Sequence, residues 1–348
     1  MNKRSSKTLA TPSASSASSA PSLLTRRAAL AGAGAVTLAA VGGSAVAAAA
    51  DASGPVGGAD PALDASHATR KVADLVVKMF QAKAARDLDG FLSYFSKRRL
   101  TYVDPIWGGQ WRTWDELYAA IGAIMPGWGP NADAYPIKII GDSRSAMLLF
   151  YDSPELFGHE IRSMAPLDFQ GGKVIRQVDY WDGRHFTIQA TKDFRLPPEQ
   201  FPREFGERAT GENASPVVRR VATALSEAFV AGNAAAAADL FAFDGSFEDL
   251  TLKSRLVGRR AIADFLKRGL RLLPYGPGSS LRHVVGSAQG GGYEWSNPNN
   301  PGGVLVNNGA VALELDRHAR ITALTALWDG ALVGDAALGA MLTATIEH

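Results

Sequence analysis

The stretch KVIRQVDYWDG (residues 173–183) has a counterpart in RITALTALWDG (residues 320–330), and both stretches end in Trp-Asp-Gly. Short runs of alternating character that end at a turn are typical of β-strands. The two Trp-Asp-Gly tripeptides lie 147 residues apart. An offset of this size predicts that one structural unit occurs twice in the chain.

Two further landmarks keep nearly the same offset. Asp104 and Asp249 each lie near the end of a short apolar stretch, and they are 145 residues apart. Pro126 and Pro274 each follow an amphipathic helical pattern, and they are 148 residues apart. A chance similarity would not keep its spacing through three landmarks, so the sequence predicts a tandem duplication.

In each half, helical patterns come first and alternating strands come last. The first half has expected helices at 72–80, 91–95 and 114–121 and strands at 102–105, 146–151, 160–169 and 173–181; the second has helices at 218–229, 237–241 and 259–266 and strands at 247–250, 304–306, 310–316 and 320–328. Few helices separate the strands. The predicted class is therefore α+β with antiparallel sheets, and not a doubly wound sheet.

The N-terminal 50 residues have the layout of an export signal. The paired arginines Arg26 and Arg27 precede an uncharged stretch, residues 28–50, that ends in small residues. This is typical of a twin-arginine signal peptide. The alternative is a retained membrane anchor, but the stretch has few of the Leu, Ile, Phe and Val residues that favour insertion. We expect cleavage, transport by the twin-arginine export machinery, no stable membrane anchor afterwards, and a periplasmic or extracellular location.

Charge and composition exclude several classes of function. Residues 1–50 carry five basic and no acidic side chains, so subtracting +5 from the formal net charge of +2 leaves −3 for the rest. Without a basic surplus, nucleic acid is not an expected partner. The chain has no cysteine, and its six histidines show no metal-ligand spacing. We expect no metal and no cofactor.

These features divide the chain into five segments. The expected segments are a signal peptide at 1–50, a linker at 51–65, a first domain at 66–190, a second linker at 191–214 and a second domain at 215–348.

The order of elements resembles the nuclear transport factor 2-like superfamily, and within it the SnoaL-like polyketide cyclases and ketosteroid isomerases. The resemblance covers residues 66–190 and 215–335. It implies two cone-shaped domains, each a strongly curved antiparallel sheet wrapped with three helices around an apolar pocket. Members of the superfamily commonly pair through their sheets, so a tandem chain would form an intramolecular pseudo-dimer and remain a monomer.

The resemblance also implies roles for individual residues. Asp104-Pro105 matches the Asp-Pro that carries the general base of the isomerases, and Asp249 matches it without the proline. The tyrosine of the isomerase oxyanion hole falls at Met79 or Phe80, and its aspartic acid falls near Met164. None of these side chains is a strong hydrogen-bond donor. The base is kept and the oxyanion hole is missing, which argues against steroid isomerisation.

The alternation of side chains along a strand predicts which candidate residues share a face of the sheet. Tyr102 and Asp104 share one face of their strand, as do Asp179 and Trp181 on theirs. If Trp181 points into the pocket, Asp179 points there too. We expect Tyr102, Met164 and Trp181 to contact a ligand.

The preceding strand adds charged candidates. Glu160, Arg162 and Met164 share a face that we expect to point inward. The hypothesis is that Asp104 is a general base with a pKa raised by burial, oriented by Arg162 or Asp179. The alternative is that Arg162 forms a structural ion pair with Asp179 or Glu160.

Tryptophans and the second half complete the site prediction. Trp107 and Trp111 flank a Gly-rich turn and either cover the pocket mouth or pack the third helix. In the second half Asp249 and Trp328 remain, but Ala326 stands where the first half has Asp179. The first half therefore carries the expected ligand site, and the second is its structural partner.

Three functions fit this pattern. The first is cofactor-free proton transfer, of an isomerase or lyase type, on a small hydrophobic molecule, with Asp104 as base. The second is a binding protein that holds such a molecule without chemistry. The third is an interaction module whose pockets are filled by side chains. Turnover that depends on Asp104 distinguishes the first from the others.

Overall fold

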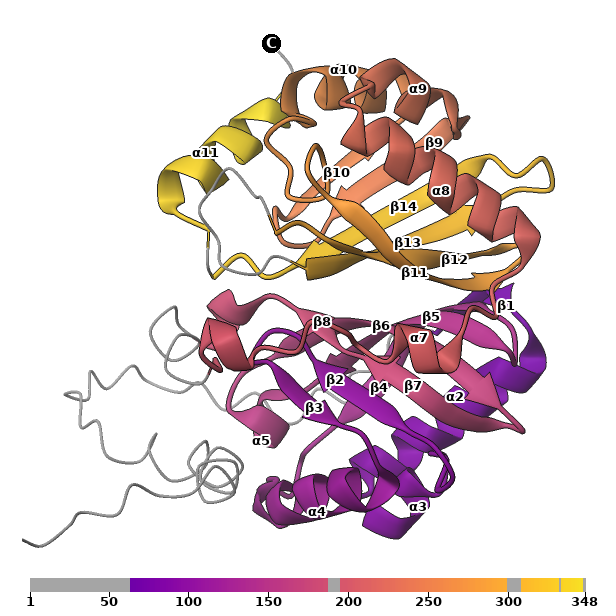
Figure 1. Ribbon diagram of the computed structural model, residues 1–348, viewed down its shortest axis with the longest axis vertical. Coiled ribbons are helices and arrows are strands. Elements are labelled where there is room, and N and C mark those ends of the chain that lie inside the picture. The colour runs from indigo at the N-terminus through magenta and orange to yellow at the C-terminus, as the bar shows by residue number, and fades with distance from the viewer. Residues whose placement is uncertain (1–62, 187–194, 299–307, 332, 347–348) are drawn as a thin grey trace, which may run out of the picture.

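The computed structural model describes residues 63–186, 195–298, 308–331 and 333–346. The expected signal peptide (1–50), nearly all of the first linker and the strand expected at 304–306 lie outside these ranges. Within them the protein is a mixed α+β molecule with two sheets and several helices. The two sheets lie face to face, and helices cover both outer faces (Figure 1).

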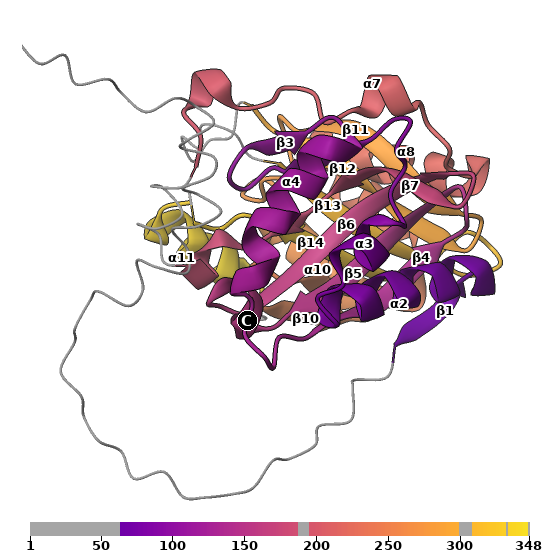
Figure 2. The same cartoon turned by 90° about the horizontal axis from the view of Figure 1, so that it is seen from below.

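The first sheet belongs to the N-terminal half. Its elements are β1 (Asp64–Ala68), α2 (Arg70–Ala84), α3 (Leu88–Leu92), β2 (Thr101–Asp104), β3 (Gly109–Trp111), α4 (Trp114–Ile124), β4 (Ala134–Gly141), β5 (Ser145–Asp152), α5 (Pro154–Phe157), β6 (Ile161–Gln170), β7 (Lys173–Val178) and β8 (Tyr180–Trp181). The strand order is β1-β4-β5-β6-β7-β2-β3, and β8 pairs with β6. Helices α2, α3 and α4 lie over the outer face of this sheet (Figure 2).

The second sheet belongs to the C-terminal half. Its elements are α7 (Glu207–Thr210), α8 (Pro216–Val230), α9 (Ala234–Asp239), β9 (Phe241–Asp249), β10 (Ser254–Val257), α10 (Arg259–Gly269), β11 (Ser280–Ser287), β12 (Gly290–Ser296), β13 (Asn308–Leu315), β14 (Ile321–Trp328) and α11 (Asp335–Ala344). The strand order is β10-β9-β14-β13-β12-β11.

Two expectations about the sheets need correction. Neither sheet is strongly curled, so the cone shape is not observed. The sheets are also not wholly antiparallel, because β2 pairs in parallel with β7 and β9 pairs in parallel with β14. In both halves the strand that ends in the acidic residue, β2 or β9, comes before the third helix and pairs with the last long strand, β7 or β14. Most of the other strands of the sheet lie between the two in sequence. This long connection permits a parallel pair.

Local sequence explains where the helices begin. Asp87 and Asn233 occupy the same place at the start of α3 and α9, and each side chain accepts a backbone N–H three residues on. Thr113 does the same for α4, and the Glu116 carboxylate accepts the Arg112 N–H at 2.7 Å. These caps satisfy N–H groups that the first helical turn leaves unpaired.

The inner faces of the sheets bury an apolar cluster with charged groups inside it. Arg176 Nη2 lies 2.6 Å from Glu294 Oε2, and Arg176 Nη1 lies 3.7 Å from Asp168 Oδ2. Tyr180 donates its hydroxyl to Glu294 at 2.7 Å, and His283 Nε2 lies 2.8 Å from Asp168. Asp168, Arg176 and Glu294 have no exposed surface. The two sheets are therefore joined by an ion-pair network that draws on both halves.

The repeated Trp-Asp-Gly tripeptides meet at this interface. The N–H of Gly183 donates to Asp329 at 3.1 Å, and the N–H of Gly330 donates to Asp182 at 3.3 Å. Each aspartate of the repeat thus caps the turn of the other half. This exchange gives a physical reason for the same tripeptide in both halves.

Candidate functional site

A small cavity lies between the outer face of the first sheet and its helices. Its volume is about 90 Å³, and side chains from α2, α4 and strands β2, β5, β6 and β7 contribute to its wall. The aromatic part of the wall consists of Phe80, Phe91, Tyr102, Trp107, Trp128, Phe150, Phe157 and Trp181. The cavity is therefore small, with room for water or one small molecule.

Asp104 lies in the cavity wall at the end of β2. Its Oδ1 accepts the backbone N–H groups of Ile106 at 2.9 Å and Trp107 at 3.2 Å, and its Oδ2 accepts the indole N–H of Trp181 at 3.1 Å. Burial raises the pKa of Asp104 to about 7, although these hydrogen bonds act in the opposite direction. A carboxyl with this pKa changes between its protonated and ionised forms near neutral pH.

Asp179 is the second carboxyl in the wall. The Tyr102 hydroxyl donates to its Oδ2, and Gln177 Nε2 donates to its Oδ1 at 2.8 Å. Burial raises the pKa of Asp179 to about 6, against the effect of these donors. The charge of Asp179 also raises the pKa of Asp104, so the two carboxyls titrate as neighbours.

A buried ion pair completes the polar part of the wall. Lys83 of α2 places its Nζ 2.5 Å and 2.8 Å from the two carboxylate oxygens of Asp152 at the end of β5. The same Nζ lies 5.1 Å from the ring centroid of Phe150 and 5.3 Å from that of Phe80. The pair was not predicted from the sequence. Its signal was a lysine on the apolar face of a helix, three residues after Phe80.

The structure brings Tyr102, Asp104, Trp107, Asp179 and Trp181 around this one cavity. The rings of Trp107 and Trp181 make a T-shaped contact, with ring centroids 5.1 Å apart and planes at 90°.

Three other candidates lie elsewhere. Trp111 packs against Tyr102, with ring centroids 5.7 Å apart, and is not part of the cavity wall. Arg162 is exposed and binds Glu160 at 2.8 Å. Met164 is fully buried between the two sheets.

The inward orientation expected for Glu160, Arg162 and Met164 is therefore wrong. Strand β6 begins at Ile161, and Ile161 and Ser163 are the residues that line the cavity. Alternation then turns the even-numbered residues to the opposite face. Arg162 does form an ion pair with Glu160, which was the alternative interpretation.

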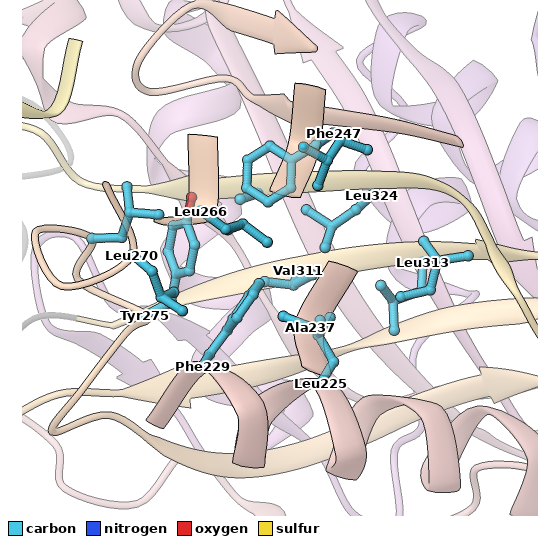
Figure 3. Close-up of a cluster of buried hydrophobic side chains, with 14 of the residues drawn as sticks. Leu225, Phe229, Ala237, Phe247, Leu266, Leu270, Tyr275, Val311, Leu313 and Leu324 are labelled. Carbon is cyan, nitrogen blue, oxygen red and sulfur yellow. The ribbon is translucent and has the colours of Figure 1, made fainter. Parts of the chain in front are cut away.

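In the C-terminal half, packed side chains surround Asp249, which is the counterpart of Asp104. Asp249 Oδ2 accepts the Trp328 indole N–H at 3.1 Å, as Asp104 does from Trp181, and also the Tyr275 hydroxyl at 2.8 Å. Asp249 has no exposed surface. Figure 3 shows Tyr275 and Phe229 within the packed apolar cluster of this half. The Asp–Trp hydrogen bond thus occurs once beside a cavity and once inside a core.

The pH dependence of stability tests the environment of Asp104. The unfolded chain has an aspartate pKa of 3.8 and the folded chain about 7, so the folded state binds more protons between these values. The stability that Asp104 contributes therefore falls as pH rises. Asn cannot take up a proton, so its contribution to stability does not change with pH. We expect the difference in free energy of unfolding, Asp104→Asn minus wild type, to increase by about 2 kcal/mol from pH 4 to pH 6. Urea unfolding across this range measures it; a difference that does not change with pH would contradict the assignment.

Two other features, a metal site and a membrane-spanning helix, are absent from the described ranges. Within them no group of three or more histidine, aspartate or glutamate side chains is placed to hold a metal ion. No helix in the same ranges is long and apolar enough to cross a membrane.

Among known proteins, those similar to this chain are found by comparison with solved structures. No protein-family model and no curated protein matches the chain. An NTF2-like protein of unknown function from Burkholderia xenovorans is 19% identical and covers 32% of this chain and 82% of its own, with a TM-score of 0.27. One from Cytophaga hutchinsonii is 13% identical and covers 32% and 90%, with a TM-score of 0.27. A steroid delta-isomerase from Pseudomonas aeruginosa is 10% identical and covers 39% and 93%, with a TM-score of 0.30.

The similar structures are thus NTF2-like and ketosteroid-isomerase-like proteins, each over about a third of this chain.

Proposed function

We propose that the N-terminal half transfers a proton on a small hydrophobic molecule, with Asp104 as the general base and no cofactor. The observation that supports this is the position of Asp104, a buried carboxyl in a cavity wall with a pKa of about 7. A general base works best when its pKa is close to the working pH. Asp179, with a pKa of about 6, is placed to orient the substrate or to take part in the transfer.

The proposal includes the architecture and the location of the protein. Two NTF2-like domains, at 66–190 and 215–348, form a pseudo-dimer within one monomeric chain. The paired Asp–Trp hydrogen bonds and the exchange between the Trp-Asp-Gly turns support it. Residues 1–50 direct export by the twin-arginine route to the periplasm or beyond, and Arg26 and Arg27 support this part.

The test is Asp104→Asn after a ligand has been found. A thermal-shift screen of small cyclic and carbonyl compounds comes first, because a ligand that binds only the folded state raises its stability. We expect turnover of a hit to fall about 100-fold in Asp104→Asn, since a positioned general base contributes at least this much.

Asp249→Asn is the matched control, because its carboxyl makes the same hydrogen bond to a tryptophan inside a packed core. This variant should turn over the hit at the wild-type rate. Unchanged turnover in Asp104→Asn would remove the base from the mechanism.

A binding protein without chemistry is the second candidate. Both oxygens of Asp104 already accept hydrogen bonds from the protein, and the same Asp–Trp pair has a purely structural place in the other half. A ligand that raises the melting temperature, but that the wild type leaves unchanged over hours, would favour this function.

A further inference from the structure

The cavity wall carries more negative than positive groups. Its titratable side chains, besides Tyr102, are the carboxyls of Asp104, Asp152 and Asp179 and the ammonium of Lys83. Lys83 binds both oxygens of Asp152, so this pair is neutral as a unit. Two carboxyls remain. Among the described residues, neither Asp104 nor Asp179 forms an ion pair with a cation.

The groups that hold these two carboxyls are neutral donors. Asp104 is held by an indole N–H and two backbone N–H groups, and Asp179 by a phenol and an amide. The guanidinium of Arg195 binds the carbonyl of Ile106 at 2.6 Å and lies 3.4 Å from Asp329. Arg195 is not part of the cavity wall. The hydrogen bonds that fix the two carboxyls therefore come from neutral donors, while the charge of Lys83 acts on Asp179 and that of Arg195 on Asp104.

An amide oxygen adds a third acceptor. Gln177 lines the cavity and is 3% exposed, and its Oε1 is buried without a hydrogen-bond partner among the described residues. A buried polar atom of this kind costs free energy unless a ligand or water satisfies it. Trp128 is the opposite case, with a buried indole N–H that has no partner in the same part of the structure. Among the described wall residues, Gln177 thus offers an acceptor to a donor on the ligand, and Trp128 offers a donor to an acceptor.

Aromatic rings form most of the remaining wall, and such rings attract cations to their faces. The protein shows this preference with its own side chain, because the Lys83 ammonium lies within 6 Å of the ring centroids of Phe80, Phe150 and Phe157. Trp107 and Trp181 offer comparable surfaces beside Asp104.

We propose that the cavity binds a small organic cation, a primary or secondary ammonium with a short apolar group. Its N–H groups donate to Asp104, Asp179 and Gln177, and its apolar part packs against Trp107 and Trp181. The cavity volume of about 90 Å³ favours a small ligand. This inference names the ligand class of the proposed function, and it rests on that function only in taking this cavity as the site.

Binding of such a cation is linked to pH. An alkylammonium group stays charged below about pH 9, by analogy with lysine. The two carboxyls lose their protons around pH 6 and pH 7, with Lys83, Asp152, Tyr102 and Arg195 as their charged or titratable neighbours. The affinity for the cation should therefore rise between pH 5.5 and pH 8.

The experiment compares isobutylamine with isobutanol, which has nearly the same shape and no charge. Titration calorimetry on the full mature chain should give a dissociation constant at least 10-fold lower for isobutylamine at pH 8, and a smaller preference at pH 5.5. The variant Asp104→Asn/Asp179→Asn should lose the preference, and Asp249→Asn should keep it. If the double variant does not fold, the comparison of the two ligands and two pH values on the wild type still decides.

The outcomes separate this inference from the proposed function. Equal affinity for the amine and the alcohol would overturn the proposal that the ligand is a cation, and the cavity would remain a ligand site. Affinity for neither would overturn the inference. Neither result depends on turnover, which the Asp104→Asn assay measures independently.

Discussion

Arg176→Met is expected to lower the free energy of unfolding by about 3–5 kcal/mol, because it leaves Glu294 and Asp168 buried without their cation. Arg176 has no exposed surface and also donates its Nε to the carbonyl of Phe205 at 2.8 Å. Methionine fills a similar volume, so most of the loss reports the unpaired carboxylates and not a cavity. Chemical denaturation followed by tryptophan fluorescence measures this change.

Arg162→Met is the matched control, since it removes an exposed arginine–glutamate pair at the start of a strand in the same sheet. We expect a change within about 1 kcal/mol, the range for exposed pairs. A second variant, Arg176→Met/Glu294→Leu, should recover part of the loss because it removes a buried charge together with its partner. A loss of less than 1 kcal/mol in Arg176→Met would show that water reaches the interface between the sheets.

Lys83→Met should have an effect of similar size, about 3–5 kcal/mol, because Asp152 would lose its ion-pair partner in a buried position. Burial already raises the pKa of Asp152, with Lys83 acting in the opposite direction. Without Lys83 this carboxyl should take up a proton more readily, so the loss should be smaller at pH 5 than at pH 8. Urea unfolding at both pH values checks the size and the direction.

The same helix offers a control for Lys83. Arg70→Met removes an exposed contact with Asp74, one helical turn further along, and should change the stability by less than 1 kcal/mol. The double variant Lys83→Met/Asp152→Leu should be more stable than Lys83→Met alone. A double variant that is less stable than either single variant would mean that the two side chains act independently.

Alternation along a strand was a reliable guide where the strand begins at a clear boundary. Tyr102 and Asp104 on β2, and Asp179 and Trp181 near β8, lie in the same cavity wall as their two-residue spacing suggests. Strand β6 shows where this reasoning fails. The turn before it contains Gly158 with a φ of 84°, and this turn decides which residue enters the sheet first. A displacement by one residue reverses every side chain.

The polar groups that the sequence did not reveal depend on contacts between distant segments. Lys83 and Asp152 are 69 residues apart and meet only after α2 packs on β5. Arg176 and Glu294 come from different sheets. In a sequence, a buried charged residue is a single charged residue within an otherwise apolar pattern. Its partner cannot be identified until the packing of the elements is known.

The interface between the sheets has a consequence for synthesis of the chain. Glu294 follows Arg176 by 118 residues, so a ribosome that adds 5–20 residues per second needs roughly 6–24 seconds to supply it. During this interval the inner face of the first sheet is open to water. Arg176 and Asp168 already pair within that face, and their charges interrupt an apolar surface to which other nascent chains could bind. We therefore expect the charges that later hold the two sheets together to protect the unfinished chain from aggregation as well.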